Sequence, residues 1–328
     1  MRAAAIVLAG TAVAAGAAAW WLGRAAPENG PAQASAAACG SKPAEPPYPG
    51  MAFVPAGEFT MGSDAAFPEE GPASRQSVSG FWIDRTEVTN AEFAAFVAAT
   101  GYRTLAERGV RIAEEPDAPL VAGSAVFRPD SLGDRIRGLE SWWKFVPGAN
   151  WRAPEGPGST LDGREHHPVV HVAWEDAAAY AEWAGKSLPT EAQFEYAART
   201  SARKNAAGEY SANTWQGIFP LRNDAADGYA GAAPVACYES NELGLYDMVG
   251  NVWEWTASAY YPRHDFAAAA EYPEGYDPIQ PDEPVAVLKG GSYLCAPDYC
   301  MRYRPQARIG QSKGLGASHI GFRTVRNP

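Results

Sequence analysis

After residue 50, apolar residues occur in short runs that glycine and proline interrupt, and few segments show helical spacing. Thr89 and Glu92 form a capping box, the pattern that opens a helix. An apolar stripe at Phe93 and Phe96 follows, and Gly101 supplies a stop signal. These features predict a helix from about residue 90 to residue 100.

Two further segments carry the same kind of signal. One starts near residues 175–176, has apolar residues at helical spacing, and stops at Gly185. The other opens with a capping box formed by Thr190 and Gln193 and runs to Arg199. We expect these helices to frame a functional site rather than to carry it.

The remaining apolar runs read as short strands at residues 167–172, 285–288 and 321–325. Long stretches around residues 103–165 and 260–284 show no regular pattern, which is uncommon in a compact domain unless the loops bind something. No repeat is visible, and no shift in composition after Gly50 marks a second domain. The pattern therefore predicts one large α+β domain over residues 50–328 with little regular secondary structure.

The amino-terminal segment has a different pattern. Met1 and Arg2 precede an uncharged run that extends to Leu22 and ends with a Trp pair. About 20 apolar residues just span a bilayer, so residues 1–24 read either as a cleaved export signal or as a retained membrane anchor. Residues 25–49 are rich in Ala, Pro and Gly and are predicted to be a flexible linker. We expect an exported domain, either periplasmic or anchored and facing the periplasm, where disulfides persist.

Composition narrows the class of protein. The 328 residues are 46% hydrophobic and 20% charged, which excludes a chain that is disordered throughout, and four cysteines are too few for a disulfide scaffold. The net charge is −11, from 27 Lys and Arg against 38 Asp and Glu. Nucleic acid and anionic membrane surfaces are thus disfavoured as main partners, whereas metal ions and basic peptides suit the charge.

The most informative segment contains Cys295 and Cys300. Cysteines five apart lie on opposite sides of a strand and roughly 140° apart on a helix, so a turn must bring them together, and Pro297 favours one. Two thiols held in this way could form a redox disulfide, bind a soft metal ion, remain as inert buried groups, or close a tight loop as a structural disulfide. The spacing alone leaves these alternatives open.

Three arginines follow the pair, at positions 302, 304 and 308. Cations near a thiol lower its pKa and favour the thiolate, although Arg302, Arg304 and Arg308 could equally be solvated or ion-paired. Tetrahedral zinc requires four ligands, and no second cysteine or histidine pair follows. Two thiolates suit Cu(I), a soft ion that accepts few ligands.

At this point the chain resembles the formylglycine-generating enzyme family, the sulfatase-modifying oxidases. Residues 290–304 carry the resemblance most specifically, with the sequence GGSYLCAPDYCMRYR. Further support comes from FVPAGEFTMGS at 53–63, TEVTN at 86–90, GKSLPTEAQFEYA at 185–197, YDMVGNVWEW at 246–255 and GFR at 321–323. The resemblance covers roughly residues 50–326 and implies a C-type-lectin-like domain.

The resemblance implies an enzyme that oxidises a cysteine of a client sulfatase, within a Cys-x-Pro-x-Arg segment, to Cα-formylglycine with O2 and Cu(I). Cys295 and Cys300 would hold Cu(I) as thiolates, with the client thiolate as the third ligand. A hydrogen is then removed from the client Cβ, and the thioaldehyde is hydrolysed to the aldehyde. Pairing of the two cysteines would give a metal-free oxidised state. We expect a monomer.

Three more positions match residues that line this site in the family. Ser292 and Tyr299 would form hydrogen bonds or orient oxygen, although Ser292 could simply support the turn. Trp253 matches an aromatic wall beside copper and oxygen, and it could equally be a core residue.

The resemblance also implies two structural calcium sites that pin the loops. Calcium prefers carboxylate, amide and backbone carbonyl oxygens, although the residues alone favour turn-capping Asn and Asp side chains. The first site falls on Asn213, Thr214, Asp227 and Tyr229, and the second on Asp247, Gly250, Val252 and Glu254. Thr214, Tyr229, Gly250 and Val252 would act through their carbonyl oxygens.

The other histidines and cysteines are assigned to structure. His167 and His171 would share a face of the predicted strand, but no third metal ligand is evident, so we expect them to be structural. Cys39 falls in the linker, and Cys237 has no partner nearby in the sequence and reads as a buried thiol.

Two rival functions remain. The first is a non-catalytic envelope binding module with a structural Cys295–Cys300 disulfide. The second is iron-dependent C–S bond formation, which would require a histidine triad that the five histidines do not supply.

Overall fold

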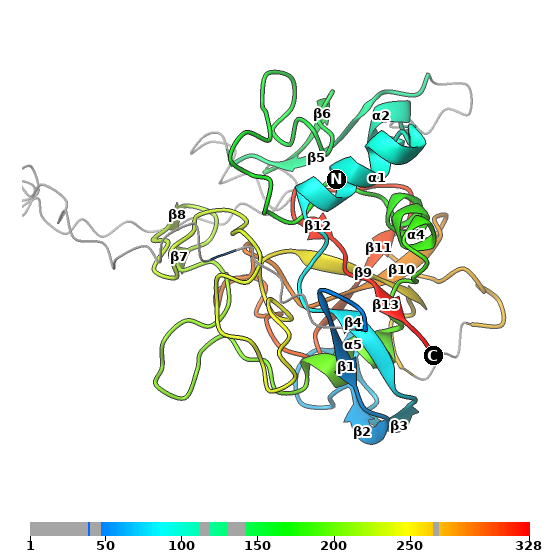
Figure 1. The fold of residues 1–328 in the computed structure, drawn as a ribbon, viewed down its shortest axis with the longest axis vertical. Coiled ribbons are helices and arrows are strands. Elements are labelled where there is room, and N and C mark those ends of the chain that lie inside the picture. The colour runs from blue at the N-terminus through cyan, green and yellow to red at the C-terminus, as the bar shows by residue number, and fades with distance from the viewer. Residues whose placement is uncertain (1–38, 40–46, 112–118, 130–141, 265–268) are drawn as a thin grey trace, which may run out of the picture. The chain divides into compact units, whose positions relative to one another are not determined.

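The computed structural model describes residue 39 and residues 47–111, 119–129, 142–264 and 269–328. Its largest sheet has the strand order β11-β10-β9-β12. The strands are β9 (Trp253–Ala259), β10 (Val285–Lys289), β11 (Arg308–Ser312) and β12 (Ile320–Gly321). β10 runs antiparallel to both of its neighbours, whereas β12 is parallel to β9. Figure 1 shows this sheet in the middle of the domain.

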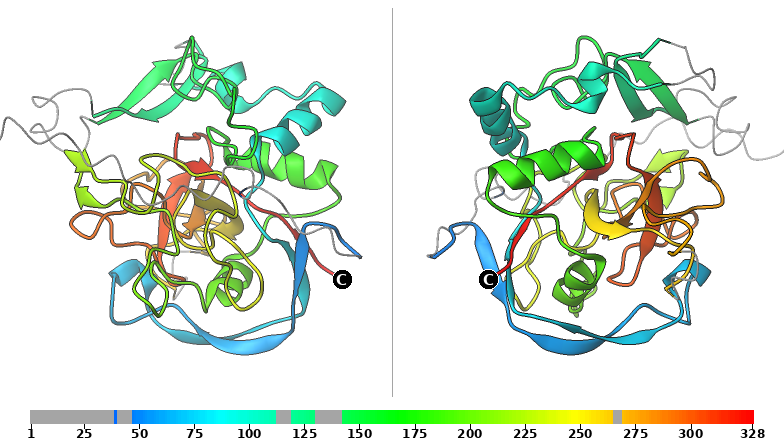
Figure 2. Two further views of the ribbon diagram at one scale, coloured as in Figure 1. Left: turned by 60° about the vertical axis from the view of Figure 1, so that its left-hand side comes forward. Right: turned by 90° about the vertical axis from the view of Figure 1, so that its right-hand side faces the viewer.

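Shorter strands surround it. A second sheet joins β1 (Met51–Val54), β4 (Phe81–Asp84) and β13 (Val325–Arg326). Three antiparallel pairs complete the strands: β2 (Gly57–Met61) with β3 (Ser74–Val78), β5 (Gly123–Phe127) with β6 (Trp143–Pro147), and β7 (Gly217–Ile218) with β8 (Arg222–Asn223). β5 and β6 lie on one side of the largest sheet and β1 to β4 on the other (Figure 2).

The helices are α1 (Asn90–Thr100), α4 (Trp174–Trp183) and α5 (Glu191–Ala198), with a short α2 (Leu105–Arg108) and a 3-10 turn η1 (Pro68–Glu70). Helices α1 and α5 begin directly after the predicted capping residues Thr89 and Thr190. Thr89 and Thr190 both accept the backbone N–H three residues on. Gly101 adopts φ 68°, the left-handed conformation that ends α1. All three predicted helices are confirmed.

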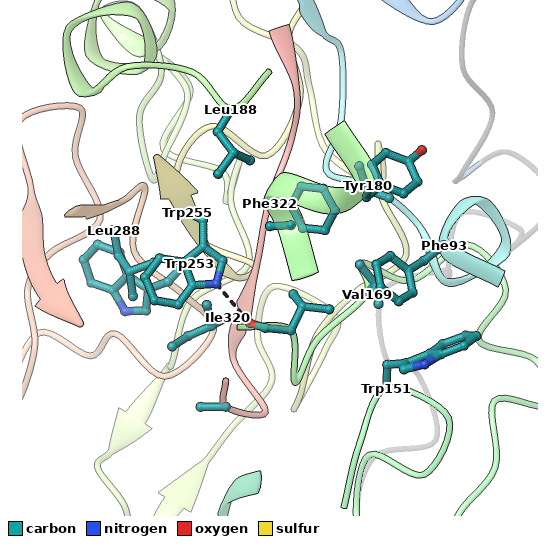
Figure 3. Packing of buried hydrophobic residues seen from close by; sticks show 14 of the residues in the cluster. Phe93, Trp151, Val169, Tyr180, Leu188, Trp253, Trp255, Leu288, Ile320 and Phe322 are labelled. Atoms are coloured by element: carbon teal, nitrogen blue, oxygen red, sulfur yellow. Dashed lines mark hydrogen bonds between the residues drawn. The ribbon is translucent and has the colours of Figure 1, made fainter. Parts of the chain in front are cut away.

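The core lies between the largest sheet and helices α1 and α4. Figure 3 shows Trp253 and Trp255 beside Leu288 and Ile320, with Phe322 nearer Tyr180. The Nε1 atom of Trp255 donates to the carbonyl oxygen of Val172 at 2.9 Å, so the polar edge of this buried ring is satisfied. Trp253, the first residue of β9, is packed into the same core.

The strand predictions are confirmed only in part. The predicted strand at 285–288 is β10, but residues 321–325 split between β12 and β13. The strand predicted at 167–172 is wrong: Pro168 makes one isolated bridge with Thr89, and His171 has φ 60°, which a strand does not allow. His167 and His171 therefore share no strand face.

Of the two stretches predicted to be irregular, only one is irregular in the structure. Residues 103–165 contain α2, β5 and β6 and are less irregular than predicted. Among the described residues of 260–284, in contrast, no helix or strand is present. The single α+β domain is confirmed.

The reading of Cys237 as a buried thiol is wrong. Cys237 forms a disulfide with Cys39, and the two Cα atoms lie 4.7 Å apart. A separation of 198 residues hid this pairing from local analysis.

The apolar run that ends at Leu22 lies outside the described residues. In the part of the chain that the structure describes, no helix is long and apolar enough to cross a membrane.

Candidate active site

A cleft of about 660 Å³ opens beside the cysteine pair. Cys295 and Cys300 lie on its wall together with three other predicted site residues, Ser292, Trp253 and Tyr299. The structure therefore brings together all five residues that the resemblance assigns to catalysis. Other parts of the wall come from Trp143, Phe219, Arg302, Gln311 and His319.

A tight turn joins the two cysteines, as their spacing requires. The N–H of Cys295 donates to the carbonyl oxygen of Ser292 at 2.9 Å, and the N–H groups of Cys300 and Met301 both donate to Ala296, at 3.1 and 3.0 Å. Cys295 and Cys300 form a disulfide, with Cα atoms 4.7 Å apart. Cys295 is buried and Cys300 is half-buried, so solvent reaches the pair from the Cys300 side.

A glycine before the turn fixes its path. Gly291 has φ 84°, and a Cβ at this position would overlap the carbonyl oxygen of Arg302. The loop can therefore fold back on itself only without a side chain here.

The three other predicted residues differ in their surroundings. The Ser292 hydroxyl is buried and accepts the N–H of Leu294 at 3.3 Å, which leaves its proton available to the cleft. The Tyr299 ring stacks on Phe219, with ring centroids 4.1 Å apart and planes 3° apart. Burial raises the pKa of Tyr299, so the phenol stays protonated. Trp253 is both a core residue and part of the wall.

The arginines after the cysteines are ion-paired. Arg302 pairs with Glu69, Arg304 with Glu70, and Arg308 with Glu191 at 2.7 Å. Of the three, only Arg302 lines the cleft. Their charges are thus largely committed to neighbouring carboxylates, which fasten the cysteine loop and β11 to η1 and α5.

The first predicted calcium set is partly assembled. Asp227 accepts the N–H of Thr214 at 2.8 Å and that of Tyr229 at 3.2 Å. Asn213 is buried, and its Oδ1 atom has no hydrogen-bond partner among the described residues. A cation would satisfy this oxygen, because buried polar atoms are normally paired.

The second predicted set is divided. Both carboxylate oxygens of Glu254 accept bonds from Arg323, at 2.7 and 2.8 Å, so Glu254 is already paired. Asp247 has one oxygen bonded to the N–H of Ala236 at 2.8 Å, whereas its Oδ1 is buried without a partner in the described chain. Gly250 and Val252 lie buried between these two residues.

Sequence analysis missed Glu87 at this place. Its side chain is fully buried, and its Oε2 atom accepts no hydrogen bond from the described residues, although Arg323 lies 4.0 Å away. Burial, with Asp247 and Glu254 nearby, raises the pKa of Glu87 well above its usual range. The Oε2 atom of Glu87 and the Oδ1 atom of Asp247 accept no hydrogen bond in the described chain, and carboxylate oxygens of this kind are ligands that calcium prefers. The described residues contain no group of three or more His, Cys, Asp or Glu side chains arranged to hold a metal ion.

His319 is the second residue that sequence analysis missed. It comes directly before β12 and lines the cleft. Burial and the nearby His171 lower the pKa of His319 to about 3, so its ring is neutral at pH 7. The signal in the sequence was weak, because a single histidine before Ile-Gly-Phe-Arg suggests no role by itself.

Comparison with known proteins now identifies the family. Residues 36–328 match the sulfatase-modifying factor enzyme 1-like domain. The chain belongs to this family.

Two related sequences and one solved structure are similar to this chain over most of its length. A formylglycine-generating enzyme of Mycobacterium tuberculosis is 46% identical over 293 residues, which cover 84% of this chain and 97% of the relative. An inactive C-alpha-formylglycine-generating enzyme 2 of Mus musculus is 37% identical and covers 84% of this chain and 85% of the relative. The structure of PvdO from Pseudomonas aeruginosa superposes with a TM-score of 0.54 at 24% identity, over 85% and 94% of the two chains, and shows a shared fold.

Proposed function

We propose that this chain is a copper-dependent formylglycine-generating enzyme that oxidises the cysteine of a Cys-x-Pro-x-Arg segment in a client sulfatase. The observation that carries the proposal is the Cys295–Cys300 pair on the wall of a peptide-sized cleft. An inactive relative exists, so membership of the family does not by itself give activity. A pair of adjacent, partly accessible thiols supplies the chemical reason for catalysis.

The cysteine pair fits a soft metal ion. Once reduced, Cys295 and Cys300 offer two thiolates that the turn already holds together. Two such ligands are enough for Cu(I), which is a soft ion. When bound, copper supplies the one-electron chemistry that activates O2. The half-buried Cys300 side leaves the client thiol a path to the pair.

The other wall residues have roles that their contacts support. The Ser292 hydroxyl keeps a proton that it can donate to an oxygen atom in the cleft. Trp253 and the stacked Tyr299 and Phe219 rings give the cleft an aromatic wall that the apolar parts of a client segment can contact. The excess of acidic residues suits a client segment that contains arginine.

Two calcium ions would stabilise the loops without taking part in the reaction. The buried unpaired oxygen of Asn213 supports the first site, and those of Asp247 and Glu87 support the second. We place Glu87 rather than the Glu254 carboxylate at the second site, because Arg323 already occupies both oxygens of Glu254.

Export is part of the proposal. The Cys39–Cys237 disulfide supports it, because disulfides of this kind persist outside the cytosol. The client would then be a sulfatase that matures in the periplasm or at its membrane.

The test is conversion of one peptide. The reduced chain, loaded with Cu(I) and supplied with O2, should convert a Cys-x-Pro-x-Arg peptide to a product whose mass shows an aldehyde in place of the thiol. Cys295→Ser and Cys300→Ser should each reduce conversion by about 100-fold, because each removes one of two copper ligands and loss of an outer-shell partner alone costs about 10- to 100-fold. Mass spectrometry measures both results.

A matched control separates chemistry from folding. Ser312→Ala alters a buried hydroxyl of β11 that bonds to Glu283 rather than lining the cleft, and it should leave conversion intact. Absence of aldehyde with copper demonstrably bound would refute the proposal. A Cys295–Cys300 disulfide that resists mild reductant, with no copper uptake afterwards, would favour the binding module.

A further inference from the structure

The backbone around His319 is held from two sides. Ala317 bridges in parallel to Ala125 of β5, and the N–H of Ser318 donates to the Ala125 carbonyl oxygen at 2.9 Å. On the other side, the N–H of Trp253 donates to the carbonyl oxygen of His319 at 2.8 Å. His319 therefore lies at a fixed place between β5 and the start of β9.

The ring of His319 is also fixed. It packs on Trp143, with ring centroids 4.6 Å apart and planes at 40°. Its Nδ1 atom is buried and has no hydrogen-bond partner among the residues that the structure describes. Since the side chain lines the cleft, the edge that remains for a ligand is the one with Nε2.

The position of the ring proton follows from these contacts. A neutral imidazole carries one N–H. A proton on Nδ1 would leave a buried donor unpaired, and such donors are rarer in proteins than unpaired acceptors. The proton is therefore assigned to Nε2, where it points a donor into the cleft.

We infer that His319 Nε2–H donates a hydrogen bond to a backbone carbonyl oxygen of the client segment, and so positions the client cysteine against Cys295 and Cys300. The inference rests on the proposed function for the identity of the client. Proline and arginine side chains have no acceptor, and the client thiol is needed at the cysteine pair. A main-chain carbonyl is the acceptor that every extended peptide presents.

Three substitutions and a non-reacting peptide test the inference. The probe is the Cys-x-Pro-x-Arg peptide with serine in place of cysteine, titrated by calorimetry into the full chain without copper. His319→Phe keeps the packing on Trp143 but removes the donor, and should weaken binding about five- to tenfold. In His319→Gln the amide nitrogen reaches the place of Nε2 and should restore affinity to within about threefold, whereas His319→Asn ends at Nδ1 and should not. His166→Phe, at an exposed histidine away from the cleft, is the matched control.

The outcomes separate this inference from the proposed function. Unchanged affinity in His319→Phe, or an equal loss in the Phe and Gln variants, overturns the donor role and leaves the oxidation untouched. Binding that depends on His319, with no aldehyde formed from the cysteine peptide by the copper-loaded parent, supports the inference and refutes the oxidation. No binding of the serine peptide by the parent chain overturns the inference, whereas the oxidation is decided separately by the mass assay of the cysteine peptide.

Discussion

At the scale of single residues, buried charges are neutralised by neighbouring side chains of opposite charge. Glu191 at the start of α5 is 3% exposed and contacts Arg308 at 2.7 Å, His264 at 3.3 Å and Lys289 at 3.6 Å. Burial alone would raise the pKa of Glu191, but Arg308 and Lys289 more than offset it and hold the pKa well below its usual range. The carboxylate thus stays ionised in the folded chain even in acid.

Glu191 should make stability depend on pH. In acid the unfolded chain binds a proton at this residue that the folded chain does not, so stability falls as the pH drops below about 4.5. Glu191→Gln leaves the buried Arg308 without its carboxylate, while Lys289 keeps Glu195 at 2.8 Å, and should cost about 3–5 kcal/mol at pH 7. That cost should shrink between pH 4.5 and pH 2, as urea unfolding of the parent and variant would measure.

An exposed pair gives the comparison. Glu58 contacts Arg75 at 2.8 Å on the surface, and Glu58→Gln should cost less than about 1 kcal/mol at any pH. A cost for Glu191→Gln that stays constant from pH 7 to pH 3 would contradict the assignment.

At the scale of elements, the sequence predicted structure where the signals are local. The capping boxes at Thr89 and Thr190 lie within the helices that they start, so α1 and α5 were predictable. The strand at 167–172 was wrong because its apolar residues pack in the core from an irregular segment, where His171 takes a positive φ. The oxygens of Glu87 and Asp247 approach only through tertiary folding, across 160 residues of chain, and left no local pattern.

The long loop between α5 and β9 is where calcium should act. It contains only the two-residue strands β7 and β8, and its buried oxygens at Asn213 and Asp247 are unpaired within the described structure. Calcium added to chelator-treated protein should raise the thermal midpoint, with a gain of about 2.7 kcal/mol for each site at 100 times its Kd. Differential scanning calorimetry measures the shift.

Glu87→Gln should reduce the calcium increment, which is the rise in thermal midpoint that added calcium produces, because the substitution weakens one of the two proposed sites. Asp176→Asn is the matched control, since Asp176 is a buried carboxylate that bonds to Ala173, Leu105 and Tyr102 far along the chain from this loop. It should lower the midpoint but keep the full calcium increment. An equal increment in parent and Glu87→Gln would remove Glu87 from the site.

At the scale of the whole molecule, the Cys39–Cys237 disulfide links the start of the matched domain to the long loop between α5 and β9. The N–H of Ala236, next to Cys237, donates to Asp247, and the Tyr229 hydroxyl lies 3.4 Å from the Cys237 sulfur. No local pattern indicates a cross-link over 198 residues. The linker predicted for residues 25–49 therefore holds a residue that the structure fastens to the domain.

Removing this cross-link should destabilise the chain without stopping the chemistry. By loop-closure entropy, the Cys39→Ser, Cys237→Ser double variant should lose up to about 5 kcal/mol, whereas loss of the short Cys295–Cys300 link should cost about 2 kcal/mol. Urea unfolding under non-reducing conditions measures both. Peptide conversion per folded chain should be unchanged in the Cys39→Ser, Cys237→Ser variant, and an equal stability in parent and variant would show that the cross-link does not form.

The two disulfides also give the protein three countable states. All four cysteines are paired in the described structure, so the fully oxidised chain should titrate no thiols. Opening only the Cys295–Cys300 link exposes two thiols, and complete reduction exposes four. The proposed copper chemistry needs the middle state, in which the catalytic pair is open while the long cross-link still holds. Opening only the Cys39–Cys237 link would also expose two thiols, so protein that is ready to load with copper is recognised by two thiols per chain that peptide mapping assigns to Cys295 and Cys300.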